Sequence, residues 1–161
     1  MYTYRMVKKF VPNSRWVRYR EGRWIPTRKR MFLYWYKFLQ IAEVSDIYQV
    51  DWSKYHGWGD RDVILNTKFD SWWEERWVEL FSIENPLDKP KFDISTESPK
   101  ADAYRIRLKV YELRHLSNGQ IGQLVSGIFE GQETHEINSR VGRHLRAAKM
   151  HLQNVCSGVF P

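Results

Sequence analysis

The stretch MFLYWYKFLQIAEV, residues 31–44, decides the fold of this chain. Its large side chains recur with the i, i+3, i+4, i+7 spacing that places residues on one face of a helix. The residues on that face are Phe32, Trp35, Tyr36, Leu39, Ala42 and Glu43. Thr27 precedes the run and is a good N-cap residue. We therefore predict an amphipathic helix over about residues 28–44.

A second aromatic helix is predicted downstream, beginning at Phe69 or Asp70. Its apolar residues have the spacing of a buried face, and the charges between them are acidic. These apolar residues are Trp72, Trp73, Trp77, Leu80 and Phe81. We interpret them as core and not as a platform for stacking bases, which basic residues would accompany.

The segment between the two helices, residues 45–60, reads as a loop with a short helical turn. Gly57 and Gly59 flank Trp58, a pattern that indicates a tight turn around a packed indole. Asp60 is positioned to cap a short helix that ends near Asn66.

The first 26 residues lack helical periodicity. Arg15 to Tyr19 and Arg23 to Ile25 flank Glu21-Gly22, which suits a short hairpin, because alternation around a glycine turn is the hairpin signal. The same residues also suit an extended basic arm, and the sequence leaves both alternatives open.

Charge is distributed unevenly along the 161 residues, whose formal net charge is +7. Residues 1–44 have a net charge of +9, residues 45–99 of −6 and residues 100–161 of +4. All eight tryptophans lie between Trp16 and Trp77. We therefore divide the chain into an aromatic-rich helical unit with a basic N-terminal arm (1–84), a connector (85–99) and a C-terminal unit (100–161). Charge pairing between segments is the alternative to two free basic surfaces.

Three helices are predicted in the last third. The first covers residues 100–116, and Ser117-Asn118-Gly119 ends it. Asn118 is expected to cap a shorter helix, Gln120 to Phe129, which a polar loop, Gly131 to His135, follows. Ser139 is expected to cap a long helix to about Ser157, with Gly158 as its C′ residue. The expected fold is thus mainly α.

The last of these helices has one apolar and one basic face. Its apolar stripe consists of Val141, Leu145, Ala148, Leu152 and Val155, and its basic face of Arg140, Arg143, His144, Arg146 and Lys149. A basic helix after a short helix and an apolar scaffold helix resembles the helix-turn-helix class of DNA-binding domains. The resemblance covers residues 100–161 only, and the connector Glu130 to Asn138 is longer than the usual turn. It implies that this helix reads a major groove, with Arg143 and Arg146 opposite the core. An ordinary solvated face is the structural alternative.

The N-terminal cations form a second candidate nucleic-acid site. Its residues are Arg15, Arg18, Arg28, Lys29 and Arg30, interleaved with aromatics. Cations mixed with aromatic rings suit stacking on single strands or contact with phosphates. Alternatively, the tryptophans attach this segment to the core and the arginines pair with the acidic middle.

The remaining patterns point away from catalysis. The histidines are scattered, and Cys156 is the one cysteine, so we expect no cofactor, no metal site and no disulfide. No apolar run is long enough for a membrane span, and we expect a cytoplasmic protein, in the host cytoplasm if it is viral.

The favoured function is DNA binding, as by a small regulator from a phage or mobile element. The alternatives are a structural or interaction protein contacting a partner through its Trp-rich region, and a metal-dependent nuclease using Asp60 and Asp62.

Overall fold

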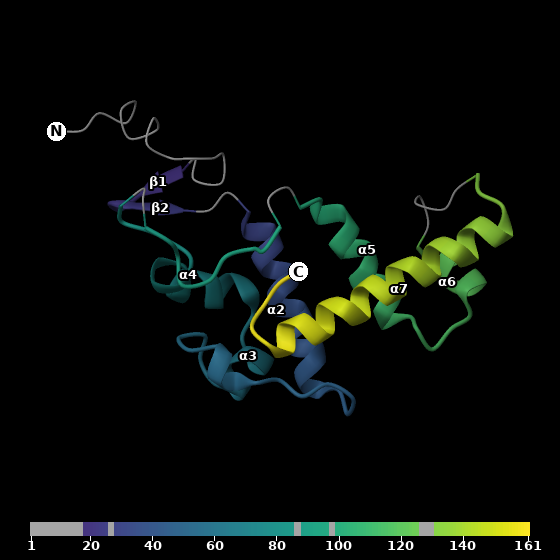
Figure 1. Ribbon diagram of the computed structural model, residues 1–161, viewed down its shortest axis with the longest axis horizontal. Helices are drawn as coiled ribbons and strands as arrows, with labels where there is room; N and C mark the ends of the chain where they lie inside the picture. Colours follow the sequence, from purple (N-terminus) through teal and green to yellow (C-terminus); the bar gives the residue numbers. More distant parts are fainter. Residues whose placement is uncertain (1–17, 26–27, 86–87, 97–98, 126–130) are drawn as a thin grey trace.

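The structure is a computed structural model that describes residues 18–25, 28–85, 88–96, 99–125 and 131–161 (Figure 1). In chain order its elements are β1 (Arg18–Arg20), β2 (Arg23–Ile25), α2 (Lys29–Val44), the 3-10 helix η1 (Trp52–Lys54), α3 (Arg61–Asn66), α4 (Phe69–Leu80), α5 (Ala101–Glu112), α6 (Asn118–Leu124) and α7 (Thr134–Cys156). The mainly α prediction is confirmed.

Helix α2 lies at the centre of the main core, as its sequence pattern indicates. Trp35, Phe38 and Leu39 are fully buried and belong to one hydrophobic cluster that extends from Met31 to Phe160. Helix α7 packs on α2 with its C-terminal half and on α5 and α6 with the rest, so that it runs along much of the molecule (Figure 1). The C-terminal helix is therefore held by the core that the first helix builds.

The turn at Trp58 is as the sequence predicts. Gly57 and Gly59 have φ values of +91° and +96°, which suit glycine, and the indole between them is completely buried. Asp60, which directly follows Gly59, accepts a hydrogen bond of 2.9 Å from the Val63 amide and so caps α3. The turn thus inserts an aromatic ring into the core and starts a helix directly afterwards.

Of the two alternatives for the N-terminal segment, the structure has the hairpin. Strands β1 and β2 pair antiparallel around Glu21 and Gly22, both with positive φ. The backbone of Trp24 exchanges two hydrogen bonds with Ile83, of 2.8 and 3.2 Å, and its indole is buried. The hairpin is therefore attached to the end of α4.

A second, smaller cluster joins the three C-terminal helices. It consists of the buried residues Val110, Ile121, Val125 and Val141. Gly122 of α6 allows close approach there, because a Cβ at that position would overlap Ile137 of α7. This contact orients α7 against α6.

Two expected helix starts were wrong. The N-cap of α6 is Ser117 and not Asn118, because the Ser117 and Gln120 side chains form a reciprocal capping box. Helix α7 begins at Thr134, five positions before the expected cap at Ser139, so residues 134–135 are helical and not loop. Packing of Ile137 on the second cluster explains the longer helix, since tertiary contacts stabilise turns that lack a strong cap.

Helix α6 ends at Leu124, with Val125 as its C-cap, and not at the expected Phe129; residues 126–129 lie outside the described residues. The expected cap Thr27 also lies outside them, and the N-cap position of α2 is Arg28, whose side chain forms no cap hydrogen bond.

Candidate nucleic-acid interface

Helix α7 separates its apolar and basic residues onto different faces. Val141, Ala148 and Leu152 are fully buried against the rest of the molecule. The four cations predicted to bind nucleic acid are all exposed: Arg140, Arg143, Arg146 and Lys149. The fifth predicted residue, His144, is half-buried.

The four exposed cations of α7 are not neutralised within the described part of the chain. None of them forms an ion pair with a described carboxylate. At ~1.5 Å rise per residue, the run from Arg140 to Lys149 covers about 14 Å of the helix. Helix α7 therefore presents a concentrated positive charge to solvent.

Several of the N-terminal cations, in contrast, form hydrogen bonds or ion pairs within the protein. Arg15 lies outside the described residues, and Arg18 lies on β1. Arg28 donates a hydrogen bond of 3.0 Å to the Thr96 carbonyl. Two further predicted site residues form ion pairs: Lys29 with Asp70 at 3.1 Å, and Arg30 with Asp102 at 3.7 Å.

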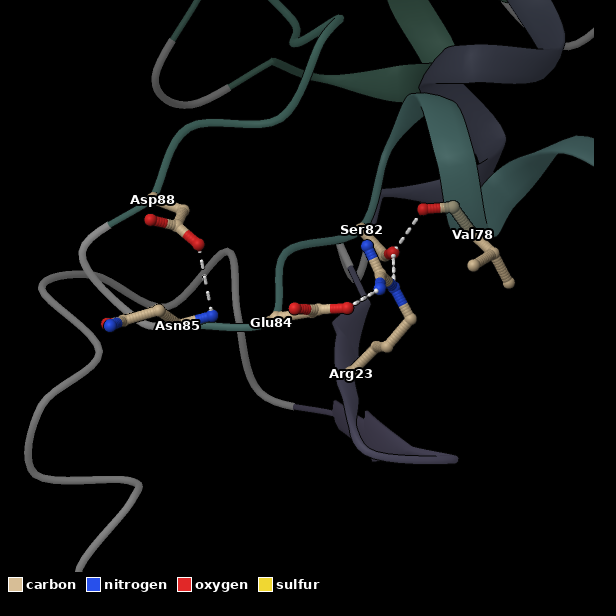
Figure 2. Close-up of polar contacts among 6 residues, drawn as sticks. All are labelled: Arg23, Val78, Ser82, Glu84, Asn85 and Asp88. Carbon is tan, nitrogen blue, oxygen red and sulfur yellow. Dashed lines mark hydrogen bonds and ion pairs between the residues drawn. The ribbon is translucent and has the colours of Figure 1, made fainter.

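Two hairpin arginines are paired in the same way. Arg23 donates from Nε to Ser82 Oγ and from Nη1 to Glu84, each at 2.6 Å. The Ser82 hydroxyl in turn donates to the Val78 carbonyl (Figure 2). Arg20 lies 3.7 Å from Glu74 and stacks on the Trp77 ring at 5.5 Å. The acidic middle of the chain thus pairs with three of the described N-terminal cations, Arg20, Arg23 and Lys29, as the alternative that the sequence left open predicts.

One residue near the basic face was missed by sequence reasoning. Arg107 of α5 lies at the seam between α5 and α7, where its guanidinium stacks on Tyr104 at 5.0 Å and lies 2.9 Å from His151 Nε2. Burial, and after it the charges of Arg107, Arg140 and Arg143, lower the pKa of His144. In the sequence Arg107 is one of several cations on its helix, and no local signal separates it from them.

His151 is a buried histidine in this seam. Its side chain is 3% exposed and packs edge-on against Phe38 and Phe160. Because Arg107 can only donate, Nε2 accepts and the proton lies on Nδ1, which has no partner among the described residues. Burial, assisted by the charge of Arg107, lowers the pKa of His151 to about 4.

This pKa predicts acid sensitivity of the fold. An unfolded histidine titrates near ~6.5, so between about pH 6.5 and 4 the unfolded chain binds more protons than the folded one. The free energy of unfolding should therefore fall by about 3 kcal/mol as the pH falls through this window, and the contribution is fully present above it. Urea denaturation at several pH values measures the change.

Two variants isolate the contribution of His151. His151→Gln should flatten the pH dependence between these limits. His135→Gln, at an exposed position near the start of α7, should leave it unchanged. An equal pH dependence in wild type and H151Q would show that His151 does not carry the effect.

The other candidate residues do not gather into a site. Asp60 is the cap of α3, and within the described ranges no group of three or more His, Cys, Asp or Glu residues is arranged to hold a metal ion. Trp72, Trp73 and Trp77 of α4 are at most 4% exposed. The Trp-rich helix therefore belongs to the core, as its spacing predicts.

Comparisons of the chain with protein-family models, with curated proteins and with solved structures found no match. None of the helices in the part of the chain that the structure describes combines the length and apolarity that crossing a membrane requires.

Proposed function

We propose that the protein binds duplex DNA, with the exposed face of α7 in the major groove. The observation that carries the proposal is the unneutralised charge of Arg140, Arg143, Arg146 and Lys149, in a chain where four of the described N-terminal cations, Arg20, Arg23, Lys29 and Arg30, form internal ion pairs. Unpaired cations on one helix face release counterions when they contact phosphates, which drives binding to polyanions.

The shape of α7 favours duplex DNA over other nucleic acids. An α-helix is about 10–12 Å across with its side chains, which matches a B-DNA major groove about 12 Å wide. Arg143 and Arg146 lie opposite the buried stripe and are placed to reach base edges, while Arg140 and Lys149 flank them toward the phosphates. The major groove of duplex RNA is too narrow for this arrangement.

Burial of the α4 tryptophans supports this proposal over a protein-contact surface. Large exposed aromatics are typical anchors of protein interfaces, but Trp72, Trp73 and Trp77 already fill the core. A small DNA-binding regulator, as in a phage or mobile element, is the biological role that we infer from the proposed activity.

Fluorescence anisotropy with labelled duplex DNA, single-stranded DNA and duplex RNA tests the proposal. We expect the tightest binding to duplex DNA. Its affinity should fall with salt between about 50 and 200 mM KCl, with a logarithmic slope of about −2 for the phosphate contacts of Arg140 and Lys149. Absence of binding at the lowest salt, or an affinity that salt does not change, would contradict it.

A further inference from the structure

Three open hollows join into one groove along α2, which we call the α2 groove. Their volumes are about 450, 340 and 400 Å³, in order along the helix. The first two hollows share Lys68 and Phe69. The last two share Lys37, Gln40 and Leu65, so the groove is continuous. Helices α3 and α4 lie on one side of α2 and α5 on the other (Figure 1).

The part of α2 that lines the groove forms a straight stripe. Its residues recur every three or four positions, which places them on one face of the helix. They are Arg30, Leu33, Lys37, Ile41 and Val44. At ~1.5 Å rise per residue the stripe covers about 21 Å, the length of about four turns of a second helix.

The groove contains apolar side chains that the core does not use. Leu33 and Leu65 are half-buried and belong to neither hydrophobic cluster. Val44, at the end of α2, is 67% exposed. A groove of this kind is typical of surfaces that receive the apolar face of an amphipathic helix.

The uncompensated charge of the groove is positive. Lys37 of α2 and Lys68 of the α3–α4 link line the same hollow, and neither forms an ion pair with a described carboxylate. The carboxylates toward the ends of the groove, Asp70 and Glu112, each form an ion pair with a lysine, at 3.1 and 3.9 Å. An acidic ligand therefore complements this groove better than a basic one.

We propose that the α2 groove binds an acidic amphipathic helix of a partner protein. Apolar side chains of that helix pack against Leu33, Leu65 and Val44, and its carboxylates pair with Lys37 and Lys68. The residues that line the groove come from α2, α3, α4, α5 and the α3–α4 link, whereas the proposed DNA-binding face is on α7. The inference therefore does not rest on DNA binding.

Fluorescence anisotropy with two labelled peptides of about 15 residues, titrated with the full chain, tests the proposal. Both peptides carry leucines at three- and four-residue spacing, flanked by glutamates in one peptide and by lysines in the other. At about 50 mM KCl the glutamate peptide should bind about tenfold more tightly than the lysine peptide, and added salt should reduce the difference. No binding of the glutamate peptide, or equal affinities for the two peptides, would overturn the proposal.

Variants of the groove separate local contacts from total charge. Lys37→Glu combined with Lys68→Glu should weaken binding of the glutamate peptide about tenfold or more, because each reversal replaces attraction by repulsion. The matched control, Lys54→Glu with Lys89→Glu, changes two exposed lysines outside the groove and should weaken binding about twofold at most. Leu65→Gln should weaken binding about fivefold at every salt concentration, because it removes apolar contact. Equal losses in the two double variants would show that the peptide responds only to net charge, and the proposal fails. Circular dichroism verifies that each variant is folded.

Duplex DNA titrated into the same variants distinguishes a protein-binding groove from a nucleic-acid contact. K37E/K68E should bind duplex DNA as the control double variant does. If K37E/K68E loses duplex binding while the control retains it, the groove contacts nucleic acid and the proposal is wrong.

Discussion

Reversing both Arg143 and Arg146 to glutamate is expected to lower the affinity for duplex DNA by about 100-fold or more. Both side chains are exposed on α7, opposite its buried stripe, and neither pairs with a described carboxylate. A well-placed arginine contact to a base is worth about 1–3 kcal/mol, and the introduced carboxylates add repulsion from the phosphates. Anisotropy titration at fixed salt measures the loss, and circular dichroism should show an unchanged helix content.

A matched control separates local charge from total charge. Lys68→Glu combined with Lys89→Glu changes the net charge of the protein by the same amount. Both lysines are exposed, and neither forms an ion pair with another described residue. We expect this variant to bind several times more weakly through long-range electrostatics and no more. Equal losses in the two double variants would show that α7 is not the contact surface.

Replacing Trp58 by alanine is expected to destabilise the fold by about 3–5 kcal/mol, the usual cost of removing a fully buried large aromatic side chain. The Trp58 indole is completely buried and lies 4.8 Å from the Trp72 ring and 5.2 Å from the Trp35 ring. It therefore joins α2 and α4 through the turn between them. Urea denaturation followed by circular dichroism at 222 nm gives the free energy of unfolding.

Two conservative variants test whether packing, and not hydrogen bonding, carries the Trp58 effect. The Trp58 Nε1 group has no hydrogen-bond partner among the described residues, so Trp58→Phe should cost only about 1–2 kcal/mol. Trp72→Phe should cost more, because Trp72 Nε1 donates to the Trp58 carbonyl at 2.8 Å. If W58A unfolds with nearly the wild-type free energy, this cluster is not the main source of stability.

Much of the helical structure followed from local sequence patterns. The extent of α2, the start of α4, the Asp60 cap and the Trp58 turn were predicted, because periodicity, caps and glycine turns act over a few residues. The start of α7 was not predicted. Its first turn lacks a side-chain cap, and its packing partner, Gly122 of α6, belongs to another element.

The candidate site likewise has one part that the sequence predicts and one part that only the tertiary structure shows. The basic face of α7 could be read from the sequence, because it is the opposite side of an amphipathic helix. The position of Arg107 beside this helix could not, since its proximity to His151, 44 positions away, depends on how α5 packs against α7.

By itself, the sequence determined the mainly α fold, the buried faces of the long helices and the alternation of basic, acidic and basic segments. Only the tertiary structure decided which basic segment is neutralised. Arg23 and Glu84 are 61 positions apart, yet the hairpin places their charged atoms 2.6 Å apart, whereas no described carboxylate reaches the exposed cations of α7. Electrostatic interaction depends on distance in space and not along the chain, so composition shows that charges can pair and folding determines which of them do.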